Sequence, residues 1–113
     1  MARINEIIGN AIKIQNLEVA ENDFSQTMFW DDAKIACAEL GNGWRLPTKE
    51  ELNTLYLNKE KIGGFTDNFY WCSLDGDNDF REVDVSWGQS FENGNKSVAS
   101  EFSTGSCRAV KSL

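Results

Sequence analysis

The alternation of hydrophobic and polar residues is clearest near the N-terminus, where it predicts a strand. Residues 11–20 alternate in two short runs that break at Gln15-Asn16, which is typical of a strand that bends or carries a bulge. Farther on, the apolar positions recur every three or four residues. This spacing predicts a helix over residues 30–40 whose buried face is formed by Trp30, Ala33, Ala36, Cys37 and Leu40.

A second helix is predicted to begin at a corner around Pro47, the only proline of the chain. Proline favours an extended conformation in the residue before it, here Leu46. Thr48 is followed three residues later by Glu51, which is the pattern of a capping box at a helix start. The helix is expected to run to about Asn58, with Leu52, Leu55 and Tyr56 facing the core.

After residue 65 the pattern predicts short strands and no helix. Residues 69–73, 82–87 and 107–111 are strand-like, and the segments between them are rich in Asp, Asn, Ser and Gly. An order of one strand, two helices and several strands favours an α+β domain with a small antiparallel sheet. The first and last strands are expected to pair, which would place the two ends of the chain close together.

Composition supports a single domain spanning residues 1–113, since 41% of the residues are apolar and 12% aromatic. The chain has 18 acidic and 11 basic side chains and a formal charge of −7, which argues against nucleic acid as a partner. No apolar run is long enough for membrane insertion, and residues 1–6 lack the apolar core of a secretory signal. Expression in the cytoplasm or within a phage particle fits these features best.

Candidate chemistry is sparse, and no enzyme, cofactor or metal site is predicted. The chain has no histidine, the commonest general base and a frequent metal ligand. Its three cysteines lack the CxxC spacing of a zinc site. Residues 75–79 (DGDND) resemble the start of a calcium loop, but Phe80 stands at the required glycine and Ser86 at the bidentate glutamate.

Several motifs together resemble one branch of a known fold. They are Trp30-Asp31-Asp32-Ala33 with Cys37, residues 43–48 (GWRLPT) with Glu51-Leu52, Tyr70-Trp71 with Ser73, Phe91-x-x-Gly94, and residues 108–111 (RAVK). The combination resembles the C-type-lectin-like domains of bacteria and phages over about residues 17–113. That branch includes the C-terminal domain of bacterial collagen-like adhesins and is similar in fold to sulfatase-modifying domains. It implies two helices packed on a small antiparallel sheet with adjacent terminal strands.

The resemblance also bears on the three cysteines. Cys37 and Cys107 match positions where such domains often carry a helix-to-strand disulfide, which would close a loop of about 70 residues and contribute roughly 4 kcal/mol. The alternative is that all three are buried as small hydrophobic side chains. Formylglycine-generating enzymes share the fold and use paired cysteines, so Cys72 and Cys107 are a second candidate pair. Those enzymes are much larger, which argues against catalysis here.

A narrower resemblance concerns residues 74–106. This segment resembles the variable region of proteins diversified by retroelements, in which a C-type-lectin-like scaffold displays mutable ligand-binding residues. Trp87, Phe91 and Gly94 match scaffold positions. Residues before, between and after them form the predicted ligand-binding set: Asp75, Asp77, Asp79, Phe80, Arg81, Asp84, Ser86, Gln89, Ser90, Glu92, Asn95, Ser97, Ser100 and Phe102.

Two functions are compatible with these features. The first is a non-catalytic recognition module for a protein or glycan on a cell surface, with Phe80 and Phe102 as aromatic anchors among small polar residues, as in antibody loops. The second is an oligomeric assembly domain of a phage tail fibre or surface polymer. Ordinary solvated loops would have a similar composition, because Asp, Asn, Gly and Ser are the usual turn residues.

Overall fold

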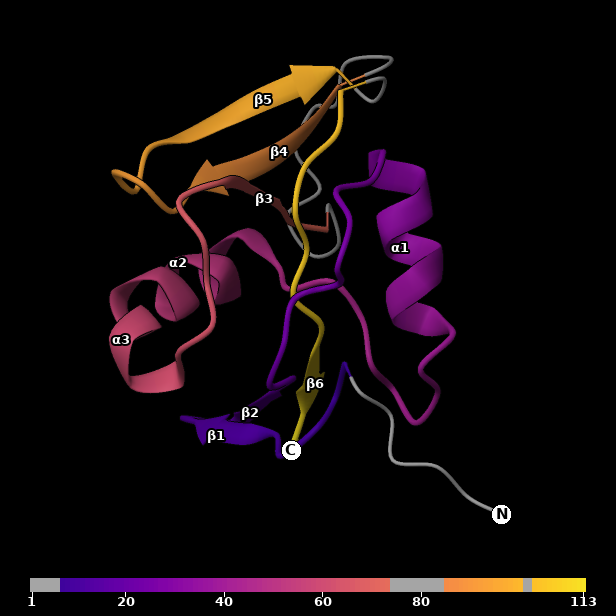
Figure 1. Ribbon diagram of the computed structural model, residues 1–113, viewed down its shortest axis with the longest axis vertical. Coiled ribbons are helices and arrows are strands. Elements are labelled where there is room, and N and C mark those ends of the chain that lie inside the picture. The colour runs from indigo at the N-terminus through magenta and orange to yellow at the C-terminus, as the bar shows by residue number, and fades with distance from the viewer. Residues whose placement is uncertain (1–6, 74–84, 101–102) are drawn as a thin grey trace.

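The computed structural model describes residues 7–73, 85–100 and 103–113, which form three helices and two small antiparallel sheets (Figure 1). The elements are, in order, β1 (Ile12–Ile14), β2 (Leu17–Val19), α1 (Trp30–Ala38), α2 (Lys49–Leu57), α3 (Lys59–Ile62), β3 (Phe69–Trp71), β4 (Val85–Ser90), β5 (Lys96–Ser100) and β6 (Val110–Ser112). None of the described helices is long and apolar enough to span a membrane.

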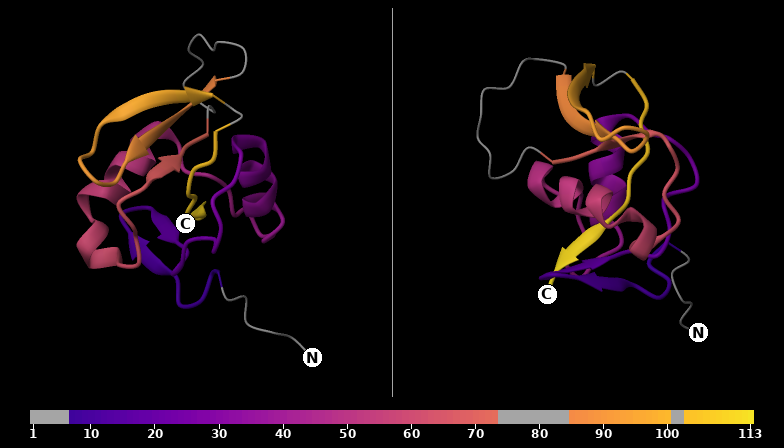
Figure 2. Two further views of the ribbon diagram at one scale, coloured as in Figure 1. Left: turned by 45° about the horizontal axis from the view of Figure 1, so that its top comes forward. Right: turned by 90° about the vertical axis from the view of Figure 1, so that its left-hand side faces the viewer.

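The predicted N-terminal strand is a hairpin rather than a bent strand. β1 and β2 pair antiparallel and are joined by Gln15 and Asn16, with Gln15 in the left-handed region at φ +56°. The break in the alternation was therefore a two-residue turn, and the prediction of one continuous strand was wrong. β6 pairs with β2 and completes the order β1-β2-β6. This confirms that strands from the two ends of the chain lie together, as Figure 2 shows.

The two predicted long helices are present. On α1 the side chains of Trp30, Ala33 and Cys37 are buried, as the periodicity indicated, whereas Ala36 is only partly buried. The helix ends at Ala38, so Leu40, also partly buried, lies beyond it. α2 begins with the predicted capping box: Glu51 N–H donates to Thr48 Oγ1 at 3.2 Å, and Thr48 N–H donates to Glu51 Oε1 at 3.0 Å. A third, four-residue helix, α3, follows α2 and was not predicted.

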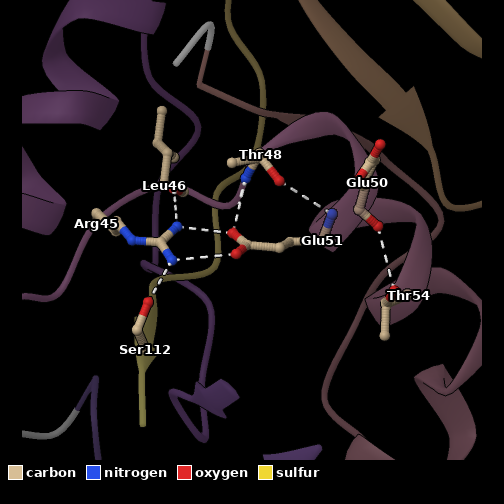
Figure 3. A network of polar contacts seen from close by, with 7 residues as sticks. All are labelled: Arg45, Leu46, Thr48, Glu50, Glu51, Thr54 and Ser112. Carbon is tan, nitrogen blue, oxygen red and sulfur yellow. Dashed lines mark hydrogen bonds and ion pairs between the residues drawn. The ribbon is translucent and has the colours of Figure 1, made fainter. Parts of the chain in front are cut away.

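The corner before α2 is tied to the C-terminal strand by Arg45 (Figure 3). Its guanidinium donates to both oxygens of Glu51, at 2.7 and 3.1 Å, and to Ser112 Oγ at 2.9 Å. Burial opposes ionisation of Glu51, but the hydrogen bonds from Arg45 and Thr48 outweigh it and hold the pKa of Glu51 below its usual value. One carboxylate thus caps the helix and anchors the corner.

The second sheet has the order β3-β4-β5 and separates two hydrophobic clusters. Successive side chains of a strand point to opposite faces. Tyr70 and Cys72 accordingly join the cluster that includes Leu52 and Leu55 of α2, whereas Trp71 joins the cluster that includes α1. Residues 96–100, predicted as loop, form β5. The last strand is shorter than predicted, because β6 begins only at Val110.

Candidate ligand-binding surface

The hairpin formed by β4 and β5 is the described part of the predicted ligand-binding segment. In its register Trp87 lies opposite Val98, Gly88 opposite Ser97, and Gln89 opposite Lys96. Residues 91–95 form the connecting turn. Since paired positions share a face, Trp87 and Gln89 lie toward α2, and Gly88 and Ser97 lie on the other face, where the Phe69 ring is packed against Gly88.

Phe91 is the hydrophobic anchor of the turn. It is fully buried, and its ring centroid lies 4.4 Å from that of Tyr70, 4.7 Å from Phe65 and 5.4 Å from Tyr56. Gly94 closes the same turn at φ +84°, and a Cβ there would stand 2.7 Å from the Tyr56 ring. Both positions therefore serve the scaffold, as the sequence predicted.

Trp87 is packed between the sheet and the start of α2. Its side chain is partly buried against the cluster that contains Leu52 and Leu55. The Lys49 ammonium lies 4.3 Å from the centre of its ring, a cation–π contact of the kind that stabilises by about 0.5–1 kcal/mol when it is exposed. Trp87 thus joins β4 to α2 and is a scaffold residue.

Next to these scaffold positions, Glu92, Asn95 and Ser97 are exposed, and Ser90 is partly exposed. The turn backbone beneath them is held by short hydrogen bonds. Glu92 N–H donates to Ser90 Oγ at 3.1 Å, and Ser90 N–H donates to the Asn95 carbonyl at 2.8 Å. These predicted ligand-binding positions therefore combine an accessible side chain with a fixed backbone, the arrangement that lowers the entropic cost of binding.

Gln89 is placed differently from its neighbours. Its side chain is 1% exposed and its Nε2 donates to Asn53 Oδ1 at 3.0 Å and to the Gly94 carbonyl at 3.1 Å. Its Oε1 has no partner among the described residues. This interior position is at odds with the predicted ligand contact, because Gln89 ties the hairpin to α2 from inside. The isolated oxygen costs stability, on the order of 1–3 kcal/mol.

The structure describes only two of the remaining predicted ligand-binding residues, Ser86 and Ser100. Asp75, Asp77, Asp79, Phe80, Arg81, Asp84 and Phe102 lie outside the described residues. Ser86 and Ser100 are strand residues paired with Ala99 and Val85. Among the residues that the structure does describe, no three or more Asp, Glu, Cys or His side chains cluster as metal ligands do.

A buried polar network, not anticipated from the sequence, lies behind the hairpin. Arg108 is fully buried; its Nε donates to Asp23 Oδ1 at 2.7 Å, and its terminal nitrogens donate to the carbonyls of Ala20, at 3.0 Å, and Gly63, at 3.2 Å. The Tyr70 hydroxyl donates to the other oxygen of Asp23. The only sequence signal was an arginine among the apolar residues of the last strand region, since Asp23 lies 85 positions away.

Burial has the largest effect on the pKa values of Asp23 and Tyr70 in this network. It raises the pKa of Asp23 above its usual value although Tyr70 and Arg108 both favour the carboxylate. Burial, together with the hydrogen bond to Asp23, raises the pKa of Tyr70 to about 12. The network therefore joins a charged arginine, a carboxylate held in a poorly solvated site and a neutral tyrosine. It connects the chain before α1, the loop after α3, β3 and the C-terminal segment.

The three cysteines are buried free thiols. Cys37 and Cys107 are in contact, and their hydrogen bond, followed by burial, raises the pKa of the Cys107 thiol far above its ordinary value. The Cys72 thiol donates instead to the Trp87 carbonyl at 3.3 Å, and Cys72 belongs to the other hydrophobic cluster. This arrangement brings together the pair predicted to form a disulfide and separates Cys72 from Cys107. The disulfide itself stays a prediction.

No protein-family description matches the chain, and no curated protein matches its sequence. Solved structures do match. Botrocetin, a C-type-lectin-like protein, is similar with a TM-score of 0.65 and 16% identity over 93% of this chain and 98% of its own. A chain from the complex of botrocetin with a mutant A1 domain of von Willebrand factor is similar with a TM-score of 0.61 and 13% identity, again over 93% and 98%. This chain therefore has the predicted C-type-lectin-like fold.

Proposed function

We propose that the chain is a non-catalytic recognition module that binds a protein or glycan ligand through the segment 74–106. The observation that carries the proposal is the division of roles within the β4–β5 hairpin. Phe91 and Gly94 face the aromatic core, whereas Glu92, Asn95 and Ser97 between and beyond them are exposed. Side chains at the exposed positions can therefore serve a ligand while the scaffold beneath them stays unchanged.

A protein ligand is favoured by two features. The exposed hairpin side chains are short or polar and stand on an ordered backbone, which suits a broad contact more than enclosure of a small molecule. The similar protein botrocetin was solved in complex with a protein domain. Phe80 and Phe102 are proposed as the aromatic anchors of the contact, with the neighbouring carboxylates selecting a basic or hydroxyl-rich surface.

We further propose that this segment is diversified by a retroelement. The support is that exposed Glu92, Asn95 and Ser97 lie beside buried Phe91 in the hairpin, so these positions can change without loss of the core. The test is to read the DNA beside the gene. A near-repeat of the 3′ end of the gene next to a reverse transcriptase, with differences confined to adenines of the repeat, would establish diversification. Its absence would leave a fixed binding module.

The binding function is tested by array screening followed by substitution. The chain is screened against glycans and bacterial surface proteins, and each hit is measured again with two triple-alanine variants: Phe80, Arg81 and Phe102, and Glu92, Asn95 and Ser97. The matched control replaces Asp32 and Glu39, exposed residues of and beside α1. We expect each triple variant to lower affinity at least about tenfold, with the control unchanged. Equal binding by all variants would contradict the proposed surface.

Light scattering distinguishes recognition from assembly. A monomer, or an oligomer in which the hairpin remains accessible to a cysteine-reactive label at position 95, is expected for a recognition module. A trimer independent of concentration, in which the Asn95→Cys label is blocked, would instead favour an assembly domain of a tail fibre or surface polymer. The exposed position of Asn95 makes it suitable for this label.

A further inference from the structure

Two asparagines of the chain precede glycine, the sequence context in which asparagine deamidates most readily. They are Asn42, between α1 and Trp44, and Asn93, in the β4–β5 turn. Glycine promotes the reaction because it has no Cβ to keep its backbone nitrogen away from the preceding side chain. The sequence alone therefore makes the two sites equivalent, and any difference between them must come from the fold.

At the first site the attacking nitrogen is available. Trp44 N–H donates to the Gly41 carbonyl at 3.1 Å, while Asn42 and Gly43 occupy the left-handed region at φ +54° and +89°. This is the backbone of a tight turn with two left-handed central residues, for which Asn-Gly is favoured. Both residues are exposed, and among the described residues the Gly43 N–H and the Asn42 side chain have no hydrogen-bond partner. A Cβ at Gly43 would meet nothing within 4 Å.

At the second site the same groups are engaged. Gly94 N–H donates to the Ser90 carbonyl at 2.8 Å, and Asn93 Oδ1 accepts from Asn95 N–H at 2.9 Å. Gly94 is packed against the Tyr56 ring, where even a Cβ would stand 2.7 Å away. Attack by Gly94 requires both hydrogen bonds to break and the turn to leave the aromatic core.

We propose that Asn42 is a site of spontaneous deamidation in the folded protein and that the fold protects Asn93. The Gly43 nitrogen forms a bond to Asn42 Cγ, the bond from Cγ to the side-chain nitrogen breaks, and ammonia leaves with the Gly43 proton. Water then opens the resulting five-membered imide to aspartate or isoaspartate. The net reaction consumes one water and releases one ammonia. It adds a negative charge to a chain whose formal charge is −7.

Deamidation of Asn42 changes the turn between α1 and Trp44, and this turn determines how the chain enters the core. Trp44, two residues after Asn42, is 5% exposed and lies in the cluster with Trp30 and Trp71. Aspartate at position 42 alters only the charge. Isoaspartate also inserts a carbon into the backbone, so the turn can no longer keep the same geometry between α1 and Trp44.

Peptide mapping by mass spectrometry tests the proposal. The intact chain is aged in mildly alkaline buffer, folded or in urea, and the gain of mass is followed at both sites. In the folded chain we expect Asn42 to react at least about tenfold faster than Asn93, because two neutral hydrogen bonds must break at Asn93. In urea the two rates should converge. Equal rates in the folded chain, faster reaction at Asn93, or an unreacted Asn42 while the urea sample reacts would overturn the proposal.

A second measurement uses the Asn42→Asp variant, which keeps the turn but cannot release ammonia from this position. Early ammonia release from the folded variant should fall to a minor fraction of that from the native chain. Release that is unchanged would place the reactive amide elsewhere and would also overturn the proposal. The outcome does not depend on whether the chain binds a ligand.

Discussion

The corner around Arg45 and the β4–β5 hairpin are held in contrasting ways. Outside the hairpin, side chains join residues far apart: at the corner Arg45 reaches Ser112, and in the buried polar network Arg108 reaches Asp23. The hairpin depends on backbone pairing and on aromatic side chains that pack beneath it, Phe91 in the turn and Trp87 against α2. In neither region do the exposed side chains of Glu92, Asn95 and Ser97 pack into the core, which leaves these hairpin positions free to vary.

The largest loss of stability, and so the strongest test of this contrast, is expected when Arg108 is removed. Arg108→Ala leaves the mostly buried Asp23 carboxylate, whose side chain is 14% exposed, without its charged partner. We expect the free energy of unfolding to fall by about 3 kcal/mol, the lower end of the range for a buried pair. Urea denaturation measures the loss. The double change Asp23→Asn with Arg108→Met should recover part of the loss, because it removes both buried charges. A single variant as stable as the native chain would contradict the central role of this pair.

A change at Gly94 tests the hairpin anchor. Gly94→Ala is strained at φ +84° and brings a Cβ against Tyr56, so we expect a loss of about 1–3 kcal/mol. The matched control is Asn95→Ala at the neighbouring exposed position, which should cost less than about 0.5 kcal/mol. Thermal denaturation of both variants provides the comparison, and equal melting temperatures would show that the turn does not depend on its glycine.

The corner is predicted to respond to pH through Glu51. Because its pKa is lowered in the folded state, the stability it contributes is present above its usual value of 4.5 and is lost as the pH falls through the lower folded pKa. Glu51→Gln should cost about 1 kcal/mol at neutral pH, discounted for partial exposure. Urea titrations at several pH values should show this difference vanish in acid. A constant difference would contradict the assignment.

The smallest effect is expected for the exposed hairpin residues. Alanine at Glu92, Asn95 and Ser97 together should lower the free energy of unfolding by less than about 1 kcal/mol, because exposed side chains away from special contacts contribute little. Calorimetry of this triple variant sharpens the contrast with the corner. Unfolding of the variant at ambient temperature would show that these residues hold the scaffold, and the proposed surface would have to be moved.

Features set by neighbouring residues were predicted well from the sequence. The capping box at Thr48 needs only the residues of one helical turn, and the faces of α1 and α2 follow from the spacing of their apolar residues. The turn at Gln15-Asn16 was missed because a break in alternation fits a bulge as well as a hairpin. β5 was missed because its serines resemble loop residues until β4 supplies their hydrogen-bond partners.

The site was predictable only where its residues act locally. Phe91 and Gly94 could be assigned to the scaffold from their motif, and the exposed Glu92 and Asn95 follow from the turn between them. Gln89 could not be assigned, because its burial depends on Asn53 of α2, 36 positions away. The partnership of Arg108 with Asp23 was hidden for the same reason, since no local pattern reveals which carboxylate meets a buried arginine.

The side chains of β3 divide between two separate cores, and this has a consequence for accuracy in folding. A slip of one residue against β4 would send Trp71 into the space of Tyr70 and Cys72, and would push those side chains toward α1. Side chains would then be misplaced in both cores at once, so each core independently disfavours the slipped pairing of β3 with β4. The two cores together therefore fix the register of β3 against β4, and the exposed residues of the adjoining hairpin take no part in that selection.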